Sequence, residues 1–172
     1  MRLKDMISTV TGLPSEAAAT VIEPTASLGE LFQEQYPRLV RLAHMLTGSN
    51  EVAEDLVQDC FAKLHTTNLA RLDQPAAYLN RSVVNAARSW GRRRKLEVAQ
   101  QWQTLPPHVS LAARELVDVL AQLPYKQRAA IVLRFYEDRS EAEIAEILDC
   151  RPGTVGSLIH RGLAHLRKVL PQ

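Results

Sequence analysis

The stretch from Ser140 to Lys168 reads SEAEIAEILDCRPGTVGSLIHRGLAHLRK, and it predicts two helices joined by a very short turn. Ser140 and Glu143 have the spacing of a capping box, so we expect the first helix to begin there. Pro152 suits the first position of a second helix and leaves only Asp149 to Arg151 for the turn. A short helix, a tight turn and a second helix make up a helix-turn-helix, whose second helix reads the major groove of DNA.

The predicted second helix has an apolar stripe and a polar face that carries basic charge without any acid. We expect the stripe to consist of Val155, Ile159, Leu163 and Leu166. The candidate DNA-binding residues are the polar residues of the other face together with the arginine just before the helix: Arg151, Thr154, Ser157, His160, Arg161, Arg167 and Lys168. Amphipathic helix pairs also occur in many bundles, where a few Arg side chains form an ordinary solvated surface. The periodicity alone leaves both interpretations open.

The composition of the whole chain favours an all-α fold. Aromatic side chains and glycine are scarce, while Ala, Leu, Arg and Glu dominate, and these features favour helices over sheet. We expect about seven helices in two small bundles joined by a flexible linker, with the helix-turn-helix in the C-terminal bundle. The first of these helices is expected to place Phe32 on its apolar side, together with the leucines around it.

Breaks in the periodicity divide the 172 residues into four segments. We expect a variable N-terminal extension over residues 1–26, a first helical domain over 27–95, a linker over 96–109 and a second helical domain over 110–172. No apolar run is long enough to span a membrane, and the N-terminus lacks a signal-peptide core. Cys60 and Cys150 are isolated, which argues against a disulfide scaffold. The sequence therefore predicts a cytoplasmic protein without membrane insertion.

The net charge of +2 is too small for a general nucleic-acid coat, but the charge is unevenly distributed. Residues 81–95 are basic without any acid, whereas the helix expected over residues 51–65 presents an acidic strip. The residues of this strip are Glu54, Asp55, Gln58 and Asp59. Glu54 and Asp55 point about 100° apart on a helix and no His joins them, so we expect a solvated or partner-facing strip rather than a metal site.

Sequence patterns typical of catalysis do not occur in the chain. It has no Gly-rich phosphate loop, no paired-His metal motif and no nucleophile elbow, and its His residues are scattered. The sequence therefore predicts neither an enzyme nor a bound cofactor or metal.

A third helix, expected from Pro75 to about Lys95, is the second candidate for a DNA-binding element. Arg81, Arg88 and Arg92 follow one another at spacings of seven and four, with Asn85 between them. Arg supplies phosphate contacts, and Asn can bond base edges. Tyr78 either stacks on an unpaired base or fills the core, and we favour the core.

Three segments together resemble the extracytoplasmic-function (ECF) class of bacterial sigma factors. They are EVAEDLVQDCFAKLH (51–65), PAAYLNRSVVNAARSWGRRRK (75–95) and LAQLPYKQRAAIVLRFYEDRSEAEIAEILDCRPGTVGSLIHRGLAHLRK (120–168). The resemblance covers residues 28–170 in order and with the spacing of the family. It implies an alternative sigma factor that directs core RNA polymerase to particular promoters, in a stress or envelope response.

The resemblance also implies a role for each segment. The acidic strip docks on a basic coiled coil of the largest polymerase subunit, and the flap of core polymerase is a further contact. The residues implied to open the minus-ten element and hold a flipped base are those of the loop 66–74 and Tyr78, Arg81, Asn85, Arg88, Ser89 and Arg92. The linker threads toward the active-site channel, and the helix-turn-helix reads the minus-thirty-five element. An anti-sigma factor is the expected regulator.

The recognition helix departs from the family in two ways. Arg151 occupies the cap position where many members have a Ser-like residue, and losing such a cap costs about 1 kcal/mol. Gly156 and Leu158, expected on the front of the helix, occupy positions where Lys and Arg are common, and an interior glycine costs a further ~1 kcal/mol. We therefore expect this helix to bind DNA weakly by itself.

Two other classes of function make different predictions for this chain. An autonomous helix-turn-helix regulator would bind duplex DNA without polymerase, normally as a dimer, but the chain has no heptad or evident dimer helix. A hydrolase or nuclease that uses the acidic strip would show metal-dependent turnover.

Overall fold

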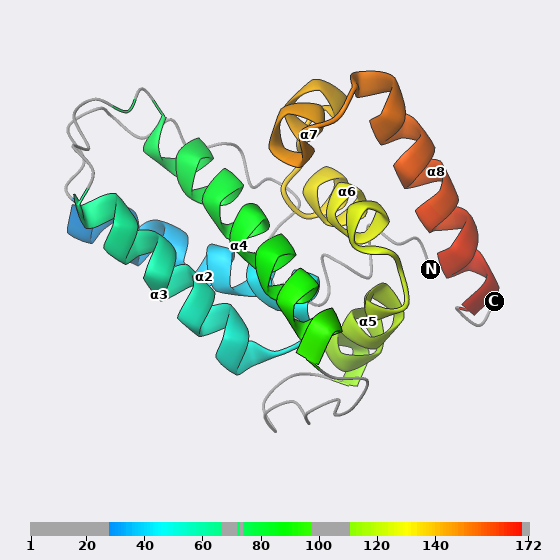
Figure 1. Cartoon of the computed structure of the whole chain (residues 1–172), viewed down its shortest axis with the longest axis horizontal. Coiled ribbons are helices and arrows are strands. Elements are labelled where there is room, and N and C mark those ends of the chain that lie inside the picture. Colours follow the sequence, from blue (N-terminus) through cyan, green and yellow to red (C-terminus); the bar gives the residue numbers. More distant parts are fainter. Residues whose placement is uncertain (1–27, 67–71, 73, 98–110, 170–172) are drawn as a thin grey trace. The chain divides into compact units, whose positions relative to one another are not determined.

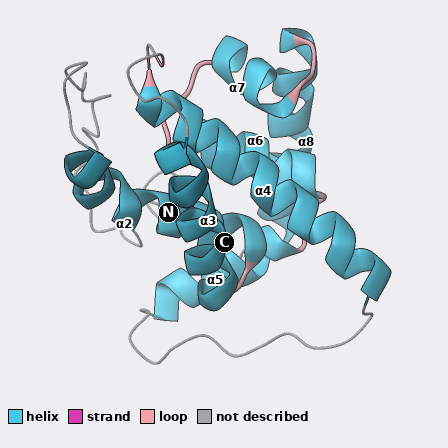
Figure 2. Ribbon diagram, turned by 60° about the vertical axis from the view of Figure 1, so that its left-hand side comes forward, coloured by secondary structure: helices cyan, strands magenta, loops and turns pink. Residues whose placement is uncertain are grey.

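The computed structural model describes residues 28–66, 72, 74–97 and 111–169, and every regular element in these ranges is an α-helix (Figures 1 and 2). The helices are α2 (Leu28–Thr47), α3 (Asn50–Thr66), α4 (Pro75–Glu97), α5 (Leu111–Ala121), α6 (Tyr125–Phe135), α7 (Glu141–Leu148) and α8 (Pro152–Val169). This confirms the predicted all-α class. The expected N-terminal extension, the linker beyond Glu97 and most of the loop before Pro75 lie outside the described residues.

The described helices fall into two compact units, and the first consists of α2, α3 and α4. Each of these three helices packs against the other two (Figure 1). Leu39, Leu64 and Leu79, one from each helix, are completely buried in the common core. Because burying a leucine stabilises a fold by roughly 1.5–3 kcal/mol, this core holds the outward faces of α3 and α4 in fixed orientations.

The second unit is built around α6, which contacts both α7 and α8, while α5 contacts α8. Residues 129–133 of α6 are buried without interruption, so this helix has no solvated face at its centre. Gly162 of α8 lies directly against it, because a Cβ at this position would approach Ile131 Cδ1 to 2.5 Å. The missing side chain therefore lets α8 lie close to α6.

The helix-turn-helix has the boundaries that its sequence predicts. Ser140 caps α7 with extended backbone angles, and its side chain and that of Glu143 form the expected capping box. Asp149 ends α7 in the left-handed conformation with φ of 50°, which Asp tolerates better than most residues. Pro152 is the first residue of α8, as predicted from its fixed φ. The turn is therefore defined by local chemistry at both ends.

Candidate nucleic-acid and protein interfaces

The four residues predicted for the acidic strip all lie exposed on α3. Asn50, the first residue of this helix, donates from Nδ2 to Glu54 Oε1 at 2.9 Å. Asp55 and Asp59 are four residues apart and so share one side of the helix, where like charges repel each other mildly. Glu51, which is not among the residues predicted for the strip, continues the same row by one turn and is also exposed. This row is an exposed acidic surface suited to a basic partner.

An aromatic cluster lies next to the acidic strip, and it was not foreseen from the sequence. The ring of Phe32 stacks on Tyr36 at 4.6 Å and meets Phe61 edge-on at 4.9 Å between centroids. Gln58 of the strip donates from Nε2 to the Tyr36 hydroxyl at 3.4 Å, which joins the two groups. Phe32 is 40% exposed, so the expectation that it belongs to the apolar side is wrong. Its ring covers Tyr36 and Phe61 at the surface instead of entering the core.

The polar residues predicted on α4 lie along one stripe of that helix. With about 100° of rotation per residue, Tyr78, Arg81, Asn85, Arg88, Ser89 and Arg92 fall within roughly 100° of its circumference. Arg81, Asn85 and Arg92 are exposed, and Arg92 Nη2 donates to Ser89 Oγ at 3.4 Å. Tyr78 is 37% exposed, so the favoured interpretation of this ring as a core residue is wrong. Leu79 and Val83 of the same helix are buried in its place.

Further along α4 the basic surface has an aromatic support. The guanidinium of Arg94 lies over the Trp90 ring, 5.0 Å from its centroid, in the geometry of a cation–π contact. The sequence shows both residues but not their pairing, although their spacing of four is the one at which helical side chains meet.

All seven candidate DNA-binding residues of the helix-turn-helix are exposed. Gly156, Ser157, His160 and Arg161 line one shallow depression on this surface. The guanidinium of Arg161 donates from Nε to the Ser157 carbonyl at 3.2 Å, which orients the side chain along the helix.

The buried side of α8 differs from the predicted stripe. Leu158, expected on the DNA-facing front, is only 7% exposed and belongs to the core. The most buried line on α8 is Val155, Leu158, Gly162 and Leu166, whereas Ile159 and Leu163 are half-buried. The buried stripe is rotated from the predicted one because α6 approaches α8 at Gly162. The prediction considered only large apolar residues and so did not include this glycine.

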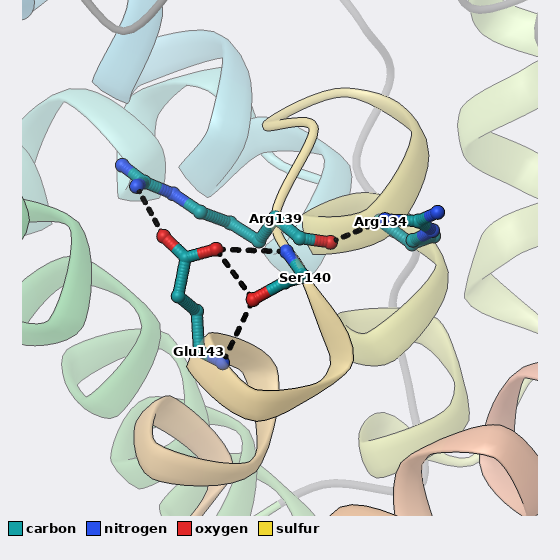
Figure 3. Close-up of polar contacts among 4 residues, drawn as sticks. All are labelled: Arg134, Arg139, Ser140 and Glu143. Atoms are coloured by element: carbon teal, nitrogen blue, oxygen red, sulfur yellow. Dashed lines mark hydrogen bonds and ion pairs between the residues drawn. The ribbon is translucent and has the colours of Figure 1, made fainter.

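A polar network fixes the start of α7 (Figure 3). Glu143 Oε2 accepts from the Ser140 backbone N–H at 2.8 Å and from its hydroxyl at 2.7 Å, and Oε1 accepts from Arg139 Nη1 at 2.9 Å. Arg134 of α6 donates from Nη1 to the Arg139 carbonyl at 2.9 Å. The hydrogen bonds from Ser140, with the cation of Arg139, lower the pKa of Glu143 to about 2. The network thus connects the end of α6 to the first turn of α7.

Other titratable groups of the described residues do not form a reactive centre. Burial raises the pKa of the Cys60 thiol to about 11, which disfavours the reactive thiolate. Within the described ranges no three His, Cys, Asp or Glu side chains lie close enough together to hold a metal ion. None of the described helices combines the length and hydropathy that a bilayer span requires.

Both units match known protein families. Residues 31–97 match sigma-70 region 2, and residues 113–166 match sigma-70, region 4. The RNA polymerase sigma-E factor of Streptomyces coelicolor is 36% identical over 159 residues, which cover 83% of this chain and 89% of that protein. The ECF RNA polymerase sigma factor SigM of Mycobacterium tuberculosis is 30% identical over 160 residues, covering 89% and 82%.

Solved structures show the same architecture. The sigma factor RpoE of Bartonella quintana, crystallised with the anti-sigma factor NepR, matches with a TM-score of 0.62 and 26% identity over 81% of this chain and 95% of that one. CnrH, in complex with the cytosolic domain of CnrY, matches in fold with a TM-score of 0.61 over 96% of this chain and 95% of that one. Two sigma regions in one chain do not fit an autonomous helix-turn-helix regulator. The chain belongs to the sigma-70 family of RNA polymerase sigma factors, within its ECF group.

Proposed function

We propose that this sigma factor docks on core RNA polymerase through α3 and reads promoter DNA through two separate elements. In this proposal the domain over residues 27–95 binds polymerase and opens the minus-ten element, and the domain over 110–172 reads the minus-thirty-five element. The protein acts in the cytoplasm, beside the polymerase, and has no catalytic activity of its own. The observation that carries the proposal is the separation of charge between α3, with its exposed acidic row, and the acid-free stripe of α4.

The acidic strip and the aromatic cluster support a docking surface for a basic protein partner. Asp55 and Asp59 supply charge that steers association, and Phe32 supplies apolar area beside it. Exposed aromatic side chains are enriched at the energetic centres of protein interfaces. The partner that fits both features is the basic coiled coil of the largest polymerase subunit.

The stripe on α4 supports capture of an unpaired strand. Tyr78 presents an exposed ring on which a base can stack, and Arg81 and Arg92 supply charge for the phosphates. Unpairing and unstacking a base costs a few kcal/mol, which stacking and hydrogen bonds to the captured base must offset. Asn85 is exposed on the same stripe and can bond a base edge.

An anti-sigma factor is the proposed regulator. The structural relatives of this chain include RpoE in complex with the anti-sigma factor NepR and CnrH in complex with the cytosolic domain of CnrY. Such a partner would compete with polymerase for the docking surface on α3. Affinity purification from the native host, followed by mass spectrometry, tests whether one exists.

The central experiment is transcription in vitro with core polymerase and a genomic promoter library. The full chain is expected to start transcripts at a small set of promoters. Asp55→Arg should abolish core binding and transcription, because it replaces an acid in the docking strip with a cation. Glu34→Arg is the matched control, since Glu34 is an exposed acid of the same unit about 200° around α2 from Phe32. A chain that starts at no promoter, or an Asp55→Arg variant that binds core as well as wild type, would refute the proposal.

Opening of the minus-ten element has its own test. Tyr78→Ala should reduce transcription from duplex promoters, because the exposed ring is lost from the stripe. The same variant should recover much of the loss on a template whose minus-ten region is already mismatched, because the unpairing cost is removed. An equal loss on both templates would contradict a role in opening.

A further inference from the structure

Helix α7 packs against α8, and in its first turn Glu141 lies next to Gly156 of α8. Glu141 is the first residue of α7 and is exposed, and its two carboxylate oxygens lie 3.5 and 3.7 Å from the position that a Cβ on Gly156 would take. Gly156 lies just past the first turn of α8 and is half-buried. The Glu141 carboxylate therefore lies against the backbone of α8 at Gly156, within ordinary contact distance of the place where a side chain would begin.

This position is at the edge of the proposed DNA-reading surface. Gly156 lines the same shallow depression as Ser157, His160 and Arg161, three residues of the candidate recognition face. The polar face of α8 itself has no acid, so Glu141 brings a carboxylate from α7 to this otherwise acid-free helix. Glu141 of α7 therefore borders the depression, whose lining residues all belong to α8.

The role of Glu141 differs from that of its neighbour Glu143. Both acids lie in the first turn of α7, where negative charge interacts favourably with the helix dipole. Glu143 is committed to Ser140 and Arg139, as Figure 3 shows. Among the described residues, no hydrogen bond or ion pair involves the Glu141 carboxylate. Its oxygens remain available as hydrogen-bond acceptors on the surface.

An acceptor that faces DNA discriminates among bases. A carboxylate is repelled by phosphates, but in the major groove it accepts a hydrogen bond from the N4 amino group of cytosine. Gly156 has no side chain to stand between the Glu141 oxygens and the depression on α8. On the Gly156 side of α8, base edges in the major groove would therefore meet the Glu141 carboxylate in addition to the basic and hydroxyl side chains of α8.

We propose that Glu141 is a specificity-determining residue for the minus-thirty-five element, with Gly156 leaving its path to the groove open. Its carboxylate accepts a hydrogen bond from a cytosine amino group at one position of the element. The inference rests on the proposed function of the C-terminal domain as the minus-thirty-five reader. It adds a base-reading residue outside α8.

The test compares promoter preferences of reconstituted holoenzymes on a library randomised across the minus-thirty-five element. Wild type is expected to prefer a C·G pair at one position, and Glu141→Ala should lower that preference about tenfold, within the range for a lost base-edge contact. Preferences at the other positions should be unchanged. Glu146→Ala is the matched control, because Glu146 is an exposed acid of the same helix about 140° away from Glu141.

A second variant tests the part played by Gly156. Gly156→Lys places an ammonium against the Glu141 carboxylate, so it should remove the same preference. Combined with Glu141→Ala, it should cause no further loss at that position. Circular dichroism of each variant checks that the helices are retained.

Three outcomes would overturn the inference. A preference that Glu141→Ala leaves intact would overturn it alone, with the proposed function unharmed. If Glu141→Ala raised transcription equally from all library members, Glu141 would only repel DNA phosphates and would not read a base. A wild-type holoenzyme that starts at no promoter would refute the proposed function itself and the inference with it.

Discussion

Replacing each of two glycines of α8 by alanine should have opposite effects on stability. Gly156 and Gly162 lie in the same helix, and alanine in a helix interior is worth about 1 kcal/mol over glycine at either position. A Cβ at Gly156 meets nothing closer than a Glu141 oxygen at 3.5 Å, which is an ordinary contact. Gly156→Ala should therefore raise the free energy of unfolding by up to ~1 kcal/mol.

At Gly162 the same methyl group meets the core. Its Cβ would lie 2.5 Å from Ile131 Cδ1, and Ile131 is completely buried in the centre of α6. Overpacking of this kind costs about 1–3 kcal/mol because neighbouring side chains leave their preferred rotamers. The loss outweighs the gain in helix propensity, so we expect Gly162→Ala to lower the free energy of unfolding by about 1 kcal/mol.

A double-mutant cycle isolates the cause. Ile131→Val removes the Cδ1 methyl that collides and by itself costs roughly 0.5–1.5 kcal/mol. In this background Gly162→Ala should become stabilising, which corresponds to a coupling of about 2 kcal/mol, well above the ~0.5 kcal/mol scatter of independent sites. The assay is urea unfolding of the full chain by circular dichroism, with hydrogen exchange of α8 amides to assign the transition. Additive effects, or a stabilising Gly162→Ala in the wild-type background, would refute the reasoning.

Four further predictions concern the cap of α7 and three charged or titratable side chains. Ser140→Ala should lower the free energy of unfolding by about 1 kcal/mol in urea titrations, because α7 loses its cap. The folded pKa of Glu143 is about 2, so its carboxylate contributes to the free energy of unfolding above pH 4.5, and this contribution is lost as the pH falls toward 2. Glu143→Gln should therefore make the free energy of unfolding depend less on pH between 4.5 and 2, as measured by acid titration. Burial lowers the pKa of His44, so the unfolded chain binds a proton more readily and the free energy of unfolding should fall as pH drops below about 6.5. In His44→Leu this fall should be smaller when urea unfolding is compared at about pH 7 and about pH 5. Arg81→Ala should reduce the slope of log affinity against log salt by about 0.7–0.9 in holoenzyme–promoter binding, whereas an unchanged slope would exclude a phosphate contact.

Local signals in the sequence were sufficient to predict the helix-turn-helix. The capping box at Ser140, the brief turn and the position of Pro152 each depend on residues within one or two turns of each other. The start of α4 at Pro75 was predicted for the same reason. Such features follow from backbone chemistry that neighbouring residues determine, and the tertiary fold leaves them unchanged.

Features that depend on contacts distant in the sequence were not predicted. The buried stripe of α8 is rotated because Gly162 allows α6 to approach, so Leu158 enters the core. Phe32 is at the surface because it stacks on a ring from its own helix and one from α3. The meeting of Glu141 with α8 likewise requires the angle between two helices, which the spacing of residues along the chain does not contain.

The division of α8 into a buried side and an exposed side has a consequence for evolution. None of the seven candidate DNA-binding residues is buried, whereas the line from Val155 to Leu166 contacts the core. Exposed substitutions usually change stability by less than ~0.5 kcal/mol. On the proposed function, substitutions on the exposed side of α8 would change promoter preference while the buried side preserves the fold. A duplicated copy of such a gene would then be able to acquire new target promoters without loss of a stable domain.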